Sequence, residues 1–192
     1  MLFRSIPNGV RIQHLEKKHT EFDFIYMGRL INWKGVDRLI ELCAELKLSA
    51  VIIGTGPEEF NLRELALKLG ADCIFPGELP KSELQDYLKK SKMFVLLSQY
   101  EGLSYALIEA LAVGIPALVS SAKGNTDVVT HGFDGIVVNV ENLKESYKEI
   151  HEVLSNEEKL NQFSKNASST AEQKYNEITR LEEMLNLIRY HK

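Results

Sequence analysis

Short apolar runs alternate along the chain with longer stretches in which apolar residues recur every three or four positions. A short run rich in β-branched and aromatic residues is typical of a buried strand, whereas the longer spacing is typical of a helix with one apolar face. The first run, FDFIYM, is followed by a helical pattern from Val36 to Leu46. The pattern predicts strands at 22–27, 50–53, 73–75, 93–97, 117–119 and 135–138, and helices at 36–46, 62–69, 84–88, 106–113 and from 142 onwards.

The alternation of strands and helices favours a parallel sheet, because parallel strands need crossover connections and these are usually helices. The predicted strands are continuous apolar runs rather than alternating apolar and polar residues. Such runs indicate burial on both faces of the sheet. We therefore predict an α/β fold, a Rossmann-like doubly wound parallel sheet of about six strands, over residues 20–170.

The two ends of the chain differ from this middle part. Residues 1–20 contain Pro7-Asn8-Gly9, which marks a turn and suggests a linker segment. Residues 171–192 contain an apolar stripe on a charged helix. Two interpretations of this helix stay open: it packs on the core of its own domain, or it covers something absent from this chain. The stripe consists of Leu181, Met184, Leu185 and Ile188.

Composition and charge exclude several classes of function. The 192 residues are 44% hydrophobic and 26% charged, with a formal net charge of −4, which is typical of a soluble globular protein. The basic residues are scattered, so we expect no nucleic-acid partner. The longest apolar runs fall short of the roughly 20 residues of a membrane span, and the amino terminus lacks a signal-peptide pattern. We expect a cytoplasmic protein without direct membrane insertion.

Neither cysteines nor histidines indicate a metal site. Cys43 and Cys73 lie in separate apolar runs, as buried free thiols do, and no CxxC motif is present. The five histidines are dispersed and form no HExxH motif. We expect no metal and no other cofactor.

In an open doubly wound sheet, ligands bind beyond the carboxyl ends of the strands, so the loops after the strands are the candidate site. Arg29 and Lys34 follow the first strand, and a pair of cations suits a diphosphate, although both could be ordinary surface charges. The second and third strands end in tight turns that let the backbone approach a ligand. The residues in question are Gly28, Gly54, Gly56, Phe75 and Gly77.

The loop after the fourth strand carries the most chemistry. We expect a helix to start there and to offer unpaired N–H groups at Leu103, Ser104 and Tyr105, which would suit a phosphate. Glu101 and Glu109 flank this helix start, and carboxylates accept hydrogen bonds from vicinal hydroxyls. Phosphate donors between two such carboxylates point to a nucleotide sugar. Taken alone, each glutamate would instead be an ordinary helix-terminus or solvent-exposed residue.

Several motifs in order give the chain a family resemblance. They are IPNGV from Ile6, GRL-x3-KG from Gly28 to Gly35, GTGP from Gly54, and the E-x7-E pair of Glu101 and Glu109 followed by ALAVGIP. This set resembles the carboxyl-terminal, donor-binding domain of GT-B glycosyltransferases of the retaining family 4 type. The resemblance covers essentially the whole chain.

The resemblance implies roles for individual positions. Arg29 and Lys34 match the cations that bind the diphosphate and neutralise the leaving group, which is why no metal is needed. Glu109 matches the glutamate that binds the ribose, and Glu101 the one that contacts the donor sugar. Phe75 to Gly77 match the edge that receives the base. The substrate-binding set is Gly28, Gly54, Gly56, Phe75, Gly77, Ser98, Gly102, Leu103, Ser104, Leu107 and Glu109, and the catalytic set is Arg29, Lys34 and Glu101.

Two departures from the family pattern bear on the substrate. The family commonly has Glu-Gly-Phe-Gly where this chain has Glu101-Gly102-Leu103-Ser104, so extra side chains lie where the sugar binds. The family often has a glutamate near Asp127, and an aspartate reaches less far. The Lys123-Gly124-Asn125 run is similar to that of polysaccharide-assembly members that use UDP-N-acetylhexosamines, and we expect UDP rather than GDP.

The resemblance also implies that half of the enzyme is missing. We expect residues 1–20 to lead in from an absent amino-terminal domain that binds a glycan or lipid-linked acceptor, and residues 171–192 to pack toward it. The absent domain could also bring the protein to the inner face of the membrane. The isolated chain would then bind the donor without catalysing transfer, in bacterial surface polysaccharide synthesis. The alternatives are a natural single-domain subunit that docks a separate acceptor subunit, and a GT-B-like sugar epimerase.

Overall fold

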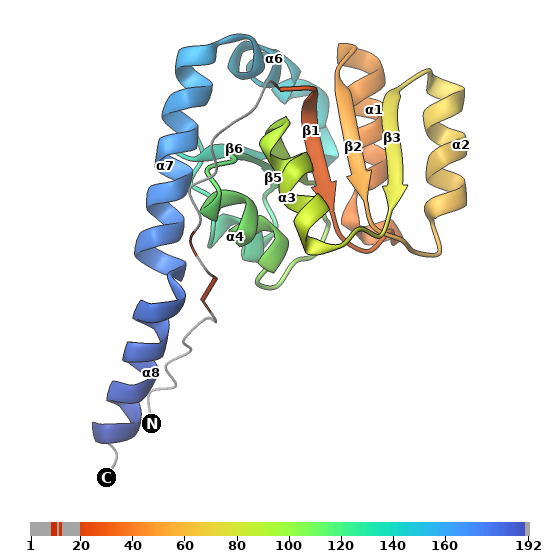
Figure 1. Ribbon diagram of the computed structural model, residues 1–192. Coiled ribbons are helices and arrows are strands. Elements are labelled where there is room, and N and C mark those ends of the chain that lie inside the picture. Colours follow the sequence, from red (N-terminus) through yellow and green to blue (C-terminus); the bar gives the residue numbers. More distant parts are fainter. Residues whose placement is uncertain (1–8, 11, 13–19, 191–192) are drawn as a thin grey trace.

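The computed structural model describes residues 9, 10, 12 and 20–190, and it contains one parallel sheet with helices around it (Figure 1). The strands are β1 (Phe22–Met27), β2 (Ser49–Ile53), β3 (Asp72–Gly77), β4 (Ser91–Leu96), β5 (Ala117–Ser120) and β6 (Gly135–Val138). The helices are α1 (Val36–Leu46), α2 (Glu59–Leu69), α3 (Lys81–Lys89), α4 (Tyr105–Ala112), α5 (Lys123–Thr126), α6 (Tyr147–Ser155), α7 (Glu157–Tyr175) and α8 (Glu177–Tyr190), with 3-10 turns η1 (Asn32–Lys34) and η2 (Val140–Ser146).

The order of the strands is β3-β2-β1-β4-β5-β6, and every neighbouring pair is parallel. The predicted doubly wound, Rossmann-like fold is therefore confirmed. The order reverses between β1 and β4, because the chain first builds outward to β3 and then returns to the other side of β1. A crevice forms at such a switch point, and ligands of open α/β sheets bind there.

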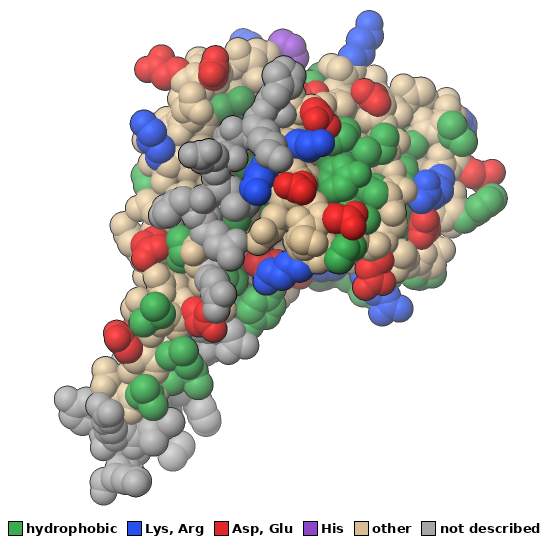
Figure 2. Space-filling model, viewed as in Figure 1, with side chains coloured by type: hydrophobic (Ala, Val, Ile, Leu, Met, Phe, Trp, Pro, Cys, Tyr) green, Lys and Arg blue, Asp and Glu red, His purple; other side chains and the backbone are tan. Residues whose placement is uncertain are grey.

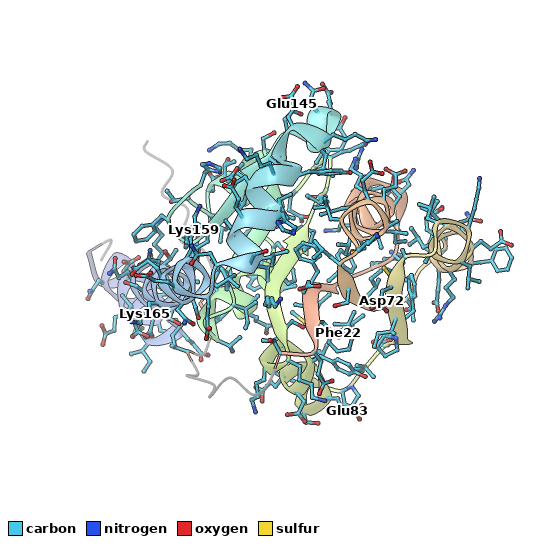
Figure 3. All side chains as sticks on the ribbon, turned by 90° about the horizontal axis from the view of Figure 1, so that it is seen from above. Phe22, Asp72, Glu83, Glu145, Lys159 and Lys165 are labelled. Atoms are coloured by element: carbon cyan, nitrogen blue, oxygen red, sulfur yellow. The ribbon has the colours of Figure 1, made fainter. Side chains whose placement is uncertain are left out.

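Helices cover both faces of the sheet. Figure 3, seen from above, has Glu83 of α3 and Glu145 of η2 on opposite sides of the strands that Phe22 and Asp72 mark. The longer helix α7 packs against α4 and continues through residue 170 to Tyr175. Helix α8 extends beyond the carboxyl ends of the strands (Figure 1).

The core lies where the central strands meet these helices. Most residues of β1, β2, β4 and β5 are buried, as the continuous apolar runs predicted. The edge strand β3 is more exposed, since no strand pairs with its outer side. The buried centre thus holds the carboxyl ends of β1 and β4 in fixed positions.

A short crossing of the chain adjoins this centre. Val10 forms a parallel bridge with Asn176, and its N–H donates to the carbonyl of Tyr175 at 2.7 Å. A Cβ on Gly9 would lie 2.3 Å from Cα of Glu177, so this approach requires glycine. The segment before β1 and the junction between α7 and α8 therefore lie together.

Candidate functional site

Three glycine turns are joined at the carboxyl ends of β1, β2 and β3. The N–H of Gly28 donates to the Ile53 carbonyl at 3.0 Å, and the N–H of Gly54 donates to the Gly77 carbonyl at 2.8 Å. Gly54 has a φ of 129°, and a Cβ there would lie 1.9 Å from the Gly28 carbonyl oxygen. Only glycine allows this approach, which leaves the backbone of the turns open to a ligand.

An open cavity of about 480 Å³ lies on these turns. The residues named from the sequence that line it are Gly28, Arg29, Gly54 and Gly56. Its apolar wall comes from residues that the sequence did not indicate, and Glu78 adds a carboxylate. These further lining residues are Met27, Ile53, Leu79 and Leu84.

A second cavity of about 570 Å³ shares Met27 and Leu84 with the first one, so the two adjoin. Glu109 of α4 lines it, with an exposed carboxylate 3.6 Å from Nζ of Lys81 on α3. Gly9, Val10 and Glu177 also line it, so the crossing of the chain closes one side. Together the cavities run from the turns after β1 and β2 to the side of α4.

Lys34 and Glu101 lie together although 67 positions separate them in the sequence. Lys34 ends the turn η1, and its Nζ donates to Oε2 of Glu101 at 2.7 Å. Their side chains are only 21% and 10% exposed, so the surrounding protein weakens screening by water. Arg29 is exposed at the same end of the sheet. The structure thus brings a cation from the first loop to a carboxylate from the fourth.

Tyr26 lies beneath these charges. The residue is 1% exposed, and its hydroxyl donates to the carbonyl of Arg29 at 2.9 Å. Burial raises the pKa of this phenol above its ordinary value, and the negative charge of Glu101 raises it further. The sequence did not single out Tyr26, since a tyrosine in an apolar run is usually part of the core.

Helix α4 begins within the segment where the sequence led us to expect free N–H groups, at Leu103, Ser104 and Tyr105. Its first residue is Tyr105, and Ser104 is the N-cap whose hydroxyl accepts from the Leu107 amide at 3.4 Å. Leu103 and Ser104 therefore precede the helix, because a serine at this position caps it by an extended backbone and a side-chain hydrogen bond. Their N–H groups, and that of Gly102, donate to no carbonyl among the described residues.

Ser98 and Leu107 are buried rather than exposed in a cavity. The Ser98 hydroxyl accepts from Nδ2 of Asn125 at 3.4 Å, and the Ser98 carbonyl accepts from the Ser120 hydroxyl at 2.6 Å. Ser98 thus belongs to a buried polar cluster under the loop after β4. Asn125 is a member of this cluster that sequence reasoning missed, because its burial depends on contacts between distant strands.

Phe75 also lies apart from the two cavities. Its ring packs under the guanidinium of Arg63, 4.9 Å from the ring centroid, on the α2 side of β3. Asp127 is exposed and forms an ion pair with Lys123. In this structure the side chains of Glu78 and Leu79, just after β3, take the place along the cavity that the sequence suggested for Phe75.

Neither a metal cluster nor a membrane-spanning helix occurs in the part of the chain that the structure describes. No group of three or more His, Cys, Asp or Glu side chains there is arranged to hold a metal ion. None of the helices within the described ranges combines the length and apolar character that crossing a bilayer requires.

Comparison with known proteins defines the class of this chain. Residues 10–170 match the model of the family "Glycosyl transferases group 1", and the chain belongs to this family. The match spans all six strands and the loops that follow them, and it leaves out only Gly9 and Glu177 among the residues that line the two cavities.

Individual relatives agree with this assignment. A GDP-mannose-dependent alpha-mannosyltransferase of Corynebacterium glutamicum is 33% identical over 121 residues, covering 63% of this chain and 28% of the relative. An Escherichia coli UDP-Gal:alpha-D-GlcNAc-diphosphoundecaprenol alpha-1,3-galactosyltransferase is 28% identical over 213 residues, covering 95% of this chain and 52% of the relative. The chain thus spans no more than about half the length of these relatives.

A solved structure shows the same fold. The structure of a point mutant of TarM from S. aureus, in complex with fondaparinux, alpha-GlcNAc-glycerol and UDP, superposes with a TM-score of 0.86 at 23% identity. The superposition covers 96% of this chain and 39% of TarM. The sheet described above is therefore the fold of a GT-B glycosyltransferase domain.

Proposed function

We propose that this chain is the donor-binding half of a retaining glycosyltransferase. The full enzyme would transfer a hexose or N-acetylhexosamine from a nucleotide diphosphate sugar to a glycan or lipid-linked acceptor, in bacterial surface polysaccharide synthesis. The observation that carries the proposal is the pair of adjoining cavities, one lined by Arg29 and the other by Glu109, with the Lys34–Glu101 pair in the loops at the same edge of the sheet.

The nucleoside would occupy the two adjoining cavities. The Glu109 carboxylate is exposed and can accept hydrogen bonds from the two ribose hydroxyls. The base would lie against Leu79 and Leu84, whose apolar side chains face the first cavity. Lys81, 3.6 Å from Glu109, would help to orient that carboxylate.

The diphosphate would lie between the glycine turns and the start of α4. The free N–H groups before α4 and the helix dipole favour an anion there. Arg29 and Lys34 would neutralise the charge that develops on the leaving diphosphate as its bond to the anomeric carbon breaks. Glu101 would accept hydrogen bonds from the donor sugar while holding Lys34 at the junction between sugar and diphosphate.

We favour UDP as the nucleotide. TarM was crystallised with UDP, and the E. coli relative is named for UDP-Gal, whereas the C. glutamicum relative is named for GDP-mannose. The Lys123-Gly124-Asn125 run supports a UDP-N-acetylhexosamine. In this proposal the positive charges of Arg29 and Lys34, with the N–H groups at the start of α4, compensate the negative charge of the diphosphate. The proposal therefore includes no metal.

The acceptor would be held by a separate domain. Three members of the predicted stripe, Leu181, Met184 and Leu185, are exposed on helix α8, as is Ile178, with exposed fractions between 44% and 68%. The side chain of Ile188, the fourth member, lies outside the part that the structure describes. Figure 2 shows hydrophobic side chains along this helix. Such a stripe would be covered by the other half of the enzyme. A separate acceptor subunit would serve equally well, which keeps the single-domain interpretation as the alternative.

Isothermal titration calorimetry with UDP, GDP and ADP tests the proposal. We expect UDP to bind, and Glu109→Ala to weaken it by about 10- to 100-fold, the worth of a hydrogen bond to a charged group. Glu152→Ala is the matched control, because Glu152 is also an exposed glutamate beside a lysine, at 3.8 Å, but lies on α6. If none of the three nucleotides binds the wild type, the proposed function is wrong.

A further inference from the structure

Asn125 lies at the centre of a buried polar cluster between the carboxyl ends of β4 and β5. The residue is 0% exposed, and its Nδ2 donates to the Ser120 hydroxyl at 2.9 Å. The same nitrogen lies 3.3 Å from the Leu96 carbonyl and 3.4 Å from the Ser98 hydroxyl. One amide group therefore ties the short helix α5 to both strand ends.

The buried position of the Asn125 side chain lowers the stability of the folded protein. Its Oδ1 is buried and has no hydrogen-bond partner among the described residues. A buried acceptor without a partner destabilises a protein, so a purely apolar side chain of similar size would suit the core better. The donors of the amide, rather than the packing of the side chain, explain why an asparagine stands here.

Helix α5 in turn contacts the loop that carries Glu101. The N–H of Gly124 donates to the Glu101 carbonyl at 3.2 Å. A Cβ on Gly124 would lie 1.8 Å from the Gly102 carbonyl oxygen, so the two backbones are in direct contact. Any movement of α5 is therefore transmitted to the Glu101–Gly102 turn.

We propose that Asn125 is a positioning residue: by anchoring α5 to the ends of β4 and β5, it fixes the Glu101–Gly102 turn at the place where the donor diphosphate and sugar bind. The ligand part of this inference rests on the proposed function, whereas the anchoring of the turn does not. Asn125 lies beneath the turn and need not touch the donor. Its effect reaches the ligand through Gly124 and the Glu101 backbone.

The test uses the whole 192-residue chain and two variants. Asn125→Leu removes the amide and keeps the number and branching of the side-chain heavy atoms. Ser120→Ala removes the hydroxyl to which Asn125 donates, together with the hydrogen bonds of that hydroxyl to the Ser98 carbonyl and the Ala122 N–H, and it serves if Asn125→Leu does not fold. The matched control is Thr170→Val, which breaks a buried hydrogen bond of 2.6 Å between Thr170 on α7 and Asp134, away from the turn.

The first readout needs no ligand. Amide hydrogen exchange followed by NMR reports the opening of the Gly124 N–H, and we expect it to be about tenfold faster in both variants, since this bond depends on the position of α5. Thr170→Val should leave the exchange of Gly124 unchanged. If the Gly124 N–H exchanges in both variants at the same rate as in the wild type, the inference is overturned.

The second readout compares two probes by calorimetry. We expect the Kd of UDP-N-acetylglucosamine to rise about tenfold in the variants, equivalent to one hydrogen bond to a charged group. UMP can reach Glu109 through its ribose but lacks the second phosphate and the donor sugar. Its Kd should therefore change by no more than about twofold, which is less than the loss of one hydrogen bond would cause. Equal weakening of both probes, or none, would overturn the inference.

The two readouts keep this inference separate from the proposed function. If the wild type binds no UDP-N-acetylglucosamine, the proposed donor is wrong, and the exchange of Gly124 still decides whether Asn125 anchors the turn. If UDP-N-acetylglucosamine binds and the variants leave its Kd unchanged, the donor proposal stands and the role of Asn125 falls.

Discussion

Tyr26 illustrates how a single buried group shapes the candidate site. Its hydroxyl donates to the Arg29 carbonyl at 2.9 Å, so it holds the loop that carries the first cation. Burial and then the Glu101 charge raise the pKa of the phenol, because both disfavour the phenolate. The folded protein therefore keeps the proton at a pH where the unfolded chain, with an ordinary tyrosine pKa of about 10, loses it.

This difference predicts a loss of stability at high pH. Above about pH 10 the unfolded state binds fewer protons than the folded state, so the free energy of unfolding falls as the pH rises. Tyr26→Phe should reduce that free energy by about 1 kcal/mol at neutral pH through the lost hydrogen bond. Above about pH 10 the free energy of unfolding of this variant should fall less steeply with pH than that of the wild type, because the variant lacks the buried phenol.

Urea unfolding between neutral and alkaline pH measures both effects. Tyr100→Phe is the control, since it removes the hydroxyl of a tyrosine that lies on the surface, 76% exposed. A Tyr26→Phe variant with the same alkaline slope as the wild type would contradict this explanation.

The candidate site was partly predictable at this scale. Arg29, Lys34, Glu101 and Glu109 stand in or just after loops that follow predicted strands, and charges in such places can be recognised from the sequence. Tyr26, Ser98 and Asn125 depend on burial between distant segments, which the sequence pattern does not reveal. That is why Ser98 was expected to contact the ligand although its hydroxyl lies in the buried cluster.

At the scale of elements, the junction between η1 and α1 depends on Gly35. This glycine has a φ of 72°, and a Cβ would lie 2.1 Å from the Leu97 carbonyl oxygen. The close approach lets the first loop contact the end of β4, which brings Lys34 to Glu101. The sequence motif GRL-x3-KG contains this glycine, but the Leu97 contact is a tertiary feature.

Two alanine substitutions separate backbone strain from steric overlap. Gly70 also has a left-handed φ, 63°, but a Cβ there meets nothing within 4 Å. We expect Gly70→Ala to cost about 1–2 kcal/mol of unfolding free energy, the strain of the left-handed region alone. Gly35→Ala should cost about 3 kcal/mol or more, because the overlap with Leu97 adds to that strain.

Chemical denaturation of both variants gives the comparison. Equal losses at Gly35 and Gly70 would mean that the loop moves aside easily and that its contact with β4 contributes little. In that case the Lys34–Glu101 pair would not be fixed by the backbone.

At the scale of the whole molecule, the face that Figure 2 shows has no dominant basic area among its coloured side chains. Figure 2 shows Lys and Arg interspersed with Asp and Glu on the viewed surface, in line with a net charge of −4. Any binding of an anion therefore depends on local groups such as Arg29 and Lys34 rather than on a long-range field.

Helix α8 carries an apolar stripe that no other described part of the molecule covers. If its stripe serves another domain or subunit, Leu181→Ala together with Leu185→Ala should change the free energy of unfolding by less than about 0.5 kcal/mol. Leu160→Ala, at a position of α7 that is 8% exposed, should cost about 2–5 kcal/mol.

Urea unfolding of the double variant and of Leu160→Ala distinguishes the two interpretations of α8. A loss of several kcal/mol in the double variant would show that the stripe packs on its own domain. That result would remove the main support for a facing domain or subunit.

The sequence by itself determined the parallel α/β fold, the six strands and the loops that hold the candidate charges, because burial on both faces leaves continuous apolar runs. Only the tertiary structure decided the strand order, the Lys34–Glu101 pair, the Asn125 cluster and the packing of Phe75 under Arg63. These features join residues far apart in the chain, and their formation depends on which strands become neighbours.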